Sequence, residues 1–360
     1  MRRSVSACNM DYSNNFMFSA FNETFAVTNF SSNRSSLNST SFNQVNAAPY
    51  PVFFKLLTVL SRCKIVIGGC GIPLNILCVW IWSQKKMRSA PGCLHFALLA
   101  IYDLIFLVIF HIKMVEYELQ LIIPRVIMMA FNFVLTLSQY CASYTTIVMS
   151  LDRSVAVTRP FKWHSMNSTT FVRKVATAVF VWSLLLTTIY WVFQWKIRID
   201  NFSVFSNYMF YVEPVLFTIL PFVVVTPTSI VIYVAVKKQR NQTAKMTATI
   251  STATKKKKNT DTVTTQVLLI SVVTVLSNAL YIAQETILKV SLFDTVDTDT
   301  DSYVMSYLLV NKLSSLMFVL NASINCFLFL FGSKFRTAFN NTLHLRSATW
   351  SSSLVTTRVE

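Results

Sequence analysis

Seven long apolar stretches constrain this chain more than any other feature of its sequence. They lie at residues 56–83, 92–112, 123–150, 172–194, 209–236, 264–288 and 304–331. A helix of about 20 apolar residues crosses the roughly 30 Å hydrocarbon core of a bilayer. The stretches are continuously apolar rather than alternating, and inside lipid only helices and closed barrels satisfy their backbone hydrogen bonds. The sequence therefore predicts an all-α membrane protein, a bundle of seven transmembrane helices.

The composition agrees with a bundle in lipid and excludes several soluble classes. Apolar residues make up 53% of the chain and charged residues only 13%, whereas soluble domains carry about 25% charged residues. The seven cysteines show no Cys-x-x-Cys or Cys/His metal spacing, so we expect neither a disulfide framework nor a bound metal cluster. We also find no nucleotide-binding loop and no nucleophile–base pair, and we expect the protein not to be an enzyme.

The distribution of charge predicts the orientation of the bundle. Most of the 32 Lys and Arg residues lie in one set of connections, and most acids lie in the opposite set. Basic connections face the cytoplasm, so with seven spans the N-terminus lies outside. The same rule accounts for the net charge of +17, and no nucleic-acid partner is expected. Segment 237–263 is interpreted as a basic cytoplasmic loop that contacts membrane lipid or a cytoplasmic partner.

The first 50 residues are polar and rich in Asn and Ser. They contain four Asn-x-Ser/Thr sequons, at Asn22, Asn29, Asn33 and Asn38. Sequons in a segment that the charge rule places outside predict a glycosylated tail, although an Asn/Ser-rich segment also produces sequons by chance. The predicted organisation is an extracellular tail at 1–55, a seven-helix domain at 56–331, and a cytoplasmic part at 332–360. That last part begins with an amphipathic helix and continues as a Ser/Thr-rich tail.

A few ionisable and amide side chains lie inside the apolar spans, where burying an ionisable group costs a few kcal/mol. Asp103 lies in the middle of the second span, and Asp152–Arg153 end the third. Glu285 and Lys312 lie toward the outer ends of the sixth and seventh spans. Asp103 with nearby amides predicts a site for a sodium ion or a proton, or a purely structural hydrogen-bond network. The amides considered for it are Asn75, Asn278, Asn321 and Asn325.

Motifs in a consistent order make the chain resemble a rhodopsin-like (class A) G-protein-coupled receptor over residues 55–345. They are GIPLN with Asn75, LALLAIYD with Asp103, SLDRSVAVTRPF with Asp152–Arg153, Trp182, Pro221, and LNASINCFLFLFGSKFR. The resemblance implies a plasma-membrane receptor that couples an extracellular ligand to a heterotrimeric G protein. It implies that Arg153 releases Asp152 when the helices splay, and that a sodium ion binds at Asp103. Arrestin and a receptor kinase are the further partners it implies.

Several family motifs are altered in this chain. Ser154 replaces the usual tyrosine after Asp-Arg, and Cys326 and Phe329 replace the Pro and Tyr of the seventh span. The sixth span has Ser277-Asn278-Ala279-Leu280 where the family has Cys-Trp-x-Pro. The family disulfide is missing, because Met128 stands at one cysteine position and the loop 195–210 contains no cysteine. An orphan or constitutively active receptor therefore remains an alternative, and a seven-span transporter or channel is a more distant one.

The resemblance also narrows the ligand. Leu135 stands where amine receptors carry an aspartate, and Val319 stands where opsins carry a lysine, so neither a monoamine nor retinal is expected. The predicted outer face is acidic and rich in aromatic residues, which suits a short basic peptide. The chain is similar to FMRFamide-type and related neuropeptide receptors. The candidate ligand contacts are Glu285, Tyr281, Lys312, Glu213 and Trp195.

Overall fold

The computed structural model falls into two units, Met1–Ser61 and Arg62–Glu360. It describes residues 51–88, 92–119, 123–161, 163, 168–192, 212, 214–247, 254–293, 300–330 and 335–342. In the first unit the described residues are the first three turns of one helix. There Thr58 Oγ1 donates to the Phe54 carbonyl at 2.9 Å, and the Phe53 and Phe54 rings meet edge to face.

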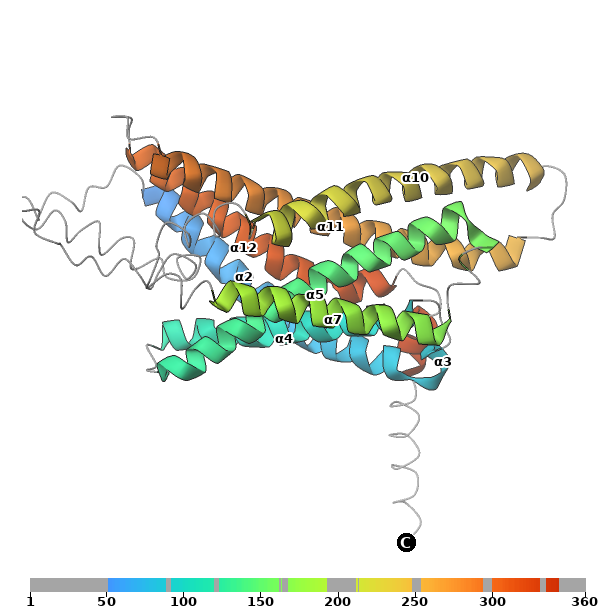
Figure 1. Ribbon diagram of the computed structural model, residues 1–360, viewed down its shortest axis with the longest axis horizontal. Helices are drawn as coiled ribbons and strands as arrows, with labels where there is room; N and C mark the ends of the chain where they lie inside the picture. Colours follow the sequence, from blue (N-terminus) through green and yellow to red (C-terminus); the bar gives the residue numbers. More distant parts are fainter. Residues whose placement is uncertain are drawn as a thin grey trace, which may run out of the picture. The chain divides into compact units, whose positions relative to one another are not determined.

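The described residues are helical almost throughout (Figure 1). The elements are α2 (Pro51–Ser83), α3 (Lys85–Arg88), α4 (Cys93–Glu118), α5 (Arg125–Thr158), α7 (Thr169–Val192), η4 (Val215–Ile219), α10 (Leu220–Thr247), α11 (Thr254–Phe293) and α12 (Thr300–Leu330). Seven helices are long and apolar enough to cross a membrane: α2, α4, α5, α7, η4 with α10, α11, and α12. The predicted all-α protein with seven spans is confirmed.

Two predicted boundaries are wrong. Helix α5 continues beyond residue 150 to Thr158, so Asp152–Arg153 lie within the helix rather than at its end. The predicted loop 237–263 is largely helical, because α10 runs to Thr247 and α11 begins at Thr254. An apolar run marks only the part of a helix that lies in lipid. Lys, Arg, Gln and Met are good helix formers, so these helices continue where the hydropathy falls.

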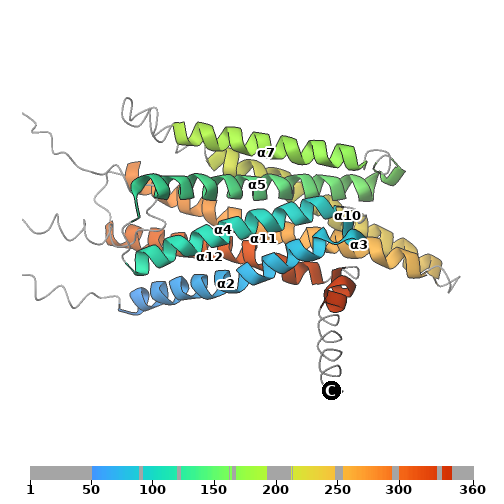
Figure 2. The same ribbon diagram turned by 90° about the horizontal axis from the view of Figure 1, so that it is seen from below.

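Within Arg62–Glu360 the helices pack against one another along much of their length (Figures 1 and 2). Helix α11 packs along α12, α4 along α5, and α10 against both α5 and α11. Helix α5 also packs against α7, and α12 against α4. Residues far apart in the sequence therefore meet at the interfaces between α4, α5, α11 and α12.

An aromatic core closes one end of these helices. Trp82 packs against Phe329 and Phe335 with ring centroids 5.6 and 5.4 Å apart. Phe335 belongs to a short helix at 335–342 and is buried, whereas Arg336 on the same helix is exposed. The amphipathic helix predicted after the seventh span is therefore confirmed.

The start of the fifth span is a π-helix. The proline that follows it, Pro221, leaves one of its backbone carbonyls without a backbone donor. In η4 the Leu220 N–H donates to the carbonyl of Val215, five residues back. The next residue, Pro221, has no N–H, so in this register the Leu216 carbonyl lacks a donor. Tyr144 of α5 supplies one, because its hydroxyl donates to the Leu216 carbonyl at 3.0 Å. The irregular turn is therefore stabilised by the neighbouring helix.

Gly71 allows α2 to approach its neighbours closely. A Cβ atom built at Gly71 would lie 2.7 Å from Ser323 Cβ on α12 and 2.8 Å from Leu107 Cδ1 on α4. Distances this short are repulsive, and Ser323 is itself fixed by a 2.7 Å hydrogen bond to the Val319 carbonyl. A side chain at this position would therefore push α2 away from both helices.

We predict that Gly71→Ala lowers the free energy of unfolding by about 1–3 kcal/mol, the usual effect of overpacking a close contact. The measurement is the thermal unfolding midpoint of the purified protein in detergent. Gly69→Ala is the matched control, because the nearest atom to a Cβ there is His111 Nε2 at 3.7 Å. Equal midpoints for Gly71→Ala and Gly69→Ala would contradict the proposed close contact.

Candidate functional site

A buried polar cluster, the Asp103 cluster, joins three helices and consists of Asp103, Asn75 and Asn325. Asp103 on α4 is only 3% exposed, and Asn325 on α12 donates to its Oδ2 through Nδ2. Asn75 on α2 instead donates to two backbone carbonyls, Gly71 O at 3.0 Å and Ala322 O at 2.8 Å. The cluster therefore connects α2 and α4 to the same segment of α12.

The other two predicted amides are associated with α11. Asn321 accepts a long hydrogen bond, 3.4 Å, from Thr274 Oγ1. Asn278 is 2% exposed, and its Nδ2 has no hydrogen-bond partner among the residues that the structure describes. The structure thus joins Asn325 to Asp103, places Asn75 against the neighbouring backbone of α12, and leaves the other two amides at the α11 side.

The Asp103 cluster has the oxygen donors that a hard cation requires. Asn75 Oδ1 and Asn325 Oδ1 are both buried and have no hydrogen-bond partner among the described residues. Buried polar atoms normally have a partner, and hard cations are bound by carboxylate and amide oxygens. The described part of the chain contains no group of three or more His, Cys, Asp or Glu residues that could hold a metal ion. A cation at this site would therefore rely on amide oxygens as well as on Asp103.

A second cluster, the Arg153 cluster, consists of Asp152, Arg153 and Trp163. Arg153 Nη2 lies 2.7 Å from Asp152 Oδ2, and Trp163 Nε1 donates to Asp152 Oδ1 at 2.7 Å. The Arg153 guanidinium also lies over the Trp163 ring, 5.5 Å from its centroid. Arg153 is only 5% exposed. Its charge is therefore paired with a carboxylate and covered by an aromatic ring.

Gly92 makes room for the Arg153 cluster. Its φ of +79° is a conformation that favours glycine, and a Cβ there would lie 3.2 Å from Arg153 Nη2. The pairing of Arg153 with Asp152 follows from their adjacent positions in the sequence. The role of Trp163 was not predicted, and its only sequence signal is an indole N–H close to a membrane boundary.

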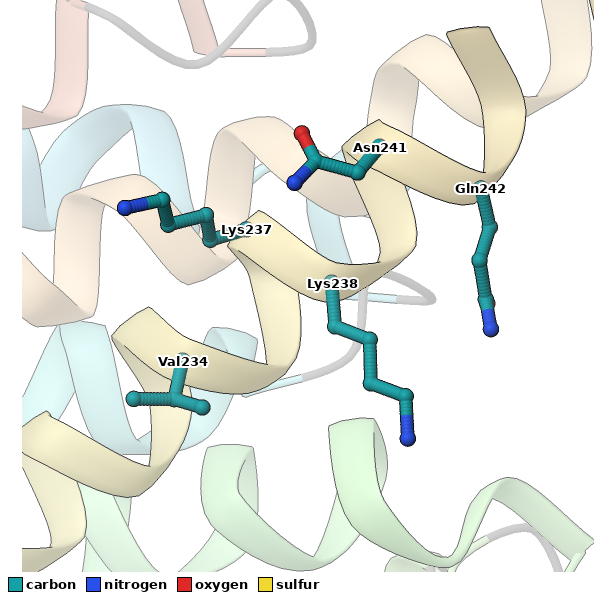
Figure 3. A pocket seen from close by; sticks show the side chains of 5 residues that line it. All are labelled: Val234, Lys237, Lys238, Asn241 and Gln242. Atoms are coloured by element: carbon teal, nitrogen blue, oxygen red, sulfur yellow. The ribbon is translucent and has the colours of Figure 1, made fainter. Parts of the chain in front are cut away.

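Helix α10 presents a polar face where its apolar span ends. Val234, Lys237, Lys238, Asn241 and Gln242 line a hollow of about 410 Å³ (Figure 3). Their spacing places them on one face of the helix, and the two lysine side chains point in different directions (Figure 3). The apolar span ends at Lys238, so this face is placed to contact anionic lipid headgroups or a partner protein.

Two of the five predicted ligand contacts have described side chains. Tyr281 on α11 packs edge to face against Phe217 and Phe318, with centroids 5.7 and 5.9 Å apart. Lys312 on α12 is 4% exposed. Helix α11 carries Glu285, but its side chain lies outside the described residues, as do Trp195 and Glu213 and the four sequons at Asn22, Asn29, Asn33 and Asn38.

The aromatic residues around Tyr281 were not predicted as a group. Phe217 also packs edge to face against Tyr140 at 5.1 Å, and Tyr140 stacks on Tyr144. These rings come from α5, η4, α11 and α12. They form a cluster, the Tyr281 cluster, that connects these four elements next to the Tyr144–Leu216 hydrogen bond.

A comparison with protein-family models identifies the family. Residues 74–329 match the model of the 7 transmembrane receptor (rhodopsin family). The match covers well over half of the chain, and it includes the Asp103 cluster and Asp152–Arg153. Proteins of this family are receptors rather than enzymes, and they generally bind extracellular ligands and heterotrimeric G proteins. The chain therefore belongs to the rhodopsin family of seven-transmembrane receptors and is a multi-pass G-protein-coupled receptor.

Proposed function

We propose that this receptor binds a short basic peptide at the extracellular end of the bundle and signals by releasing Arg153. The observation that carries the proposal is the Arg153 cluster, in which Asp152 and Trp163 together cover the guanidinium. A G protein is expected to bind only after the helices separate and expose this arginine. The peptide drives that change if it binds the open arrangement more tightly than the closed one.

The charge distribution of the sequence supports the orientation and the ligand class. Basic connections on one side favour a plasma-membrane receptor with its N-terminus outside and a glycosylated tail. The acidic opposite side attracts basic side chains. Tyr281 and its aromatic neighbours provide ring faces and edges at which peptide side chains bind. In this proposal Glu285, Tyr281, Lys312, Glu213 and Trp195 remain the ligand contacts, and FMRFamide-type peptides are the first class to test.

A constitutively active or orphan receptor is the second candidate function. The absence of the family's sixth-span tryptophan and proline, where this chain has Ser277-Asn278-Ala279-Leu280, and the absence of the family disulfide favour it. The paired and covered state of Arg153 favours low basal activity instead. In either case arrestin and a receptor kinase would act on the Ser/Thr-rich tail.

We also propose that the Asp103 cluster binds a sodium ion in the inactive receptor. The unpartnered oxygens of Asn75 and Asn325 support this proposal, together with the carboxylate of Asp103. A bound cation would add favourable interactions to α2, α4 and α12 in their closed arrangement. Movement of α12 during activation would separate these ligands.

Cells that express the receptor and a promiscuous G protein are exposed to each peptide of a neuropeptide library. We predict that one class of peptide raises intracellular calcium. The response should saturate with peptide concentration and disappear in Arg153→Ala, because the charge that a G protein needs is removed. Surface expression of Arg153→Ala must equal that of the wild type. A full response from Arg153→Ala, or silence across the library despite good surface expression, would argue against this mechanism or this ligand class.

Trp163→Phe is predicted to raise basal signalling without peptide. Phenylalanine keeps a ring beside Arg153 but cannot donate to Asp152, and one hydrogen bond to a carboxylate contributes about 1.5–3 kcal/mol. The measurement is basal second-messenger level per receptor at the cell surface. Trp80→Phe is the control, because Trp80 is 61% exposed. If both variants signal at the wild-type basal level, the Trp163 contact does not hold the receptor inactive.

Sodium is predicted to raise the thermal unfolding midpoint of the purified receptor relative to potassium at equal ionic strength. A gain of roughly 1 kcal/mol corresponds to about 1–2 °C for a protein of 360 residues. The difference should vanish in Asp103→Asn, which keeps the shape of the side chain and removes its charge. Asn321→Ala should retain it. A sodium effect that persists in Asp103→Asn would place the ion elsewhere.

A further inference from the structure

Lys64 is a buried amine for which the described residues supply no counter-charge. It lies on α2 with 0% of its surface exposed, and its Nζ donates to Ser315 Oγ on α12 at 3.3 Å. Among the described residues no carboxylate lies within salt-bridge distance of Lys64. A single long hydrogen bond to a neutral hydroxyl compensates little of the cost of removing an ammonium group from water.

The facing surface of α12 adds further polar groups to this position. Asn311 and Lys312 precede Ser315 by four and three residues, so the three side chains share one face of the helix. Asn311 is 2% exposed and Lys312 is 4% exposed, and Asn311 Oδ1 has no hydrogen-bond partner in the described part of the chain. Together with Lys64, these three residues form what we name the Lys64 cluster.

His111 of α4 contacts the turn of α2 that follows Lys64. Gly68 lies one turn from Lys64, and a Cβ there would lie 3.1 Å from Val319 Cγ1 and against the ring of His111. His111 Nε2 lies 3.0 Å from the Ile65 carbonyl, and Nδ1 lies 2.8 Å from the Leu107 carbonyl. The histidine therefore brings no negative charge that would balance Lys64.

The Lys64 cluster lies toward the end of the bundle opposite Arg153. Lys64 precedes Asn75 by 11 residues on the same helix, which corresponds to about 16 Å along the axis. The cluster thus lies well away from the Asp103 cluster, toward the start of α2. In the proposed orientation this is the extracellular half of the receptor.

We propose that the Lys64 cluster binds a carboxylate group of the extracellular ligand. This inference rests on the proposed function and adds an acidic group to the basic peptide, either a free C-terminus or an Asp or Glu side chain. The two oxygens of a carboxylate accept hydrogen bonds from the Lys64 ammonium and from other donors of the cluster, such as the Ser315 hydroxyl. The buried positive charge is then paired only when the ligand is bound.

The first experiment tests the site without a peptide. The thermal unfolding midpoint of the full-length receptor in lipid nanodiscs is measured with 4-phenylbutyrate and with its neutral amide, 4-phenylbutanamide. We expect the acid to raise the wild-type midpoint by about 2–4 °C and the amide to leave it unchanged. Lys64→Met should abolish the shift, and Lys64→Arg should retain it because the charge remains.

Lys55→Met is the matched control on the same helix, because Lys55 is exposed. With 4-phenylbutyrate, the unfolding midpoint of Lys55→Met should rise as much as that of the wild type. Lys64→Met without any probe should unfold at a higher temperature than the wild type, because an unbalanced buried charge is replaced by an apolar side chain of similar length. An acid shift that is absent from the wild type, or equally large in Lys64→Met, would overturn the proposal.

The second experiment identifies the source of the carboxylate. Each active peptide is compared with versions in which one acidic group is made neutral. A C-terminal amide replaces the free C-terminal acid, Asn replaces Asp, or Gln replaces Glu. Loss of one carboxylate should raise the half-maximal concentration at least about tenfold in the wild type, and this difference should disappear in Lys64→Met. Neutral variants that are as potent as the acids would overturn the proposal. If no peptide is active, the proposed ligand class fails, while the phenylbutyrate result still decides the carboxylate site.

Discussion

Polar groups inside the apolar spans are offered partners only within the bundle, because hydrocarbon offers none. This constraint determines how the helices of Arg62–Glu360 meet. Asn325 joins α12 to Asp103 on α4, Asn75 joins α2 to the α12 backbone, and Ser150 joins α5 to Ser271 on α11 at 2.9 Å. Each bond connects helices that are distant in the sequence. A movement of one helix therefore exposes polar groups of another, which is how a ligand at one end can change the arrangement at the other.

The altered family motifs are accommodated by contacts that the sequence alone does not reveal. Phe329, which stands in place of a tyrosine, packs into the aromatic core with Trp82 and Phe335. Its backbone carbonyl accepts a 2.7 Å hydrogen bond from Gln266 of α11, so α11 and α12 are connected at this end through a main-chain acceptor. Cys326 replaces a proline and is buried in the same core cluster as Cys78 of α2. The end of the seventh span is therefore packed tightly against α2 and α11 without the residues usual for the family.

Much of the fold and part of the site could be predicted from the sequence. Physical reasons separate the features that could be predicted from those that could not. Long apolar runs predict the seven helices because the thickness of the bilayer sets their length, and a buried Asp103 predicts amide partners because an isolated carboxylate in lipid is costly. Trp163 could not be predicted, since its contact with Asp152 depends on how the chain turns after α5. The Tyr281 cluster was equally hidden, because Phe217 and Phe318 look like any other apolar residues of their spans. The Lys64 cluster shows a similar limit, because only the packing of α2 on α12 reveals that Lys64 is enclosed.

The π-helix at the start of the fifth span has a consequence for the side chains at its own beginning. A π-turn contains about one residue more than an α-turn, so the first residues of η4 are rotated by roughly 100° relative to a regular helix that continues α10. Which of these side chains face the other helices is therefore set by the turn next to Pro221. Because Tyr144 contacts a main-chain carbonyl of this turn, side-chain substitutions in η4 leave that hydrogen bond in place. Different side chains can therefore occupy the inward-facing side of η4 while its backbone register is kept by a tyrosine on another helix.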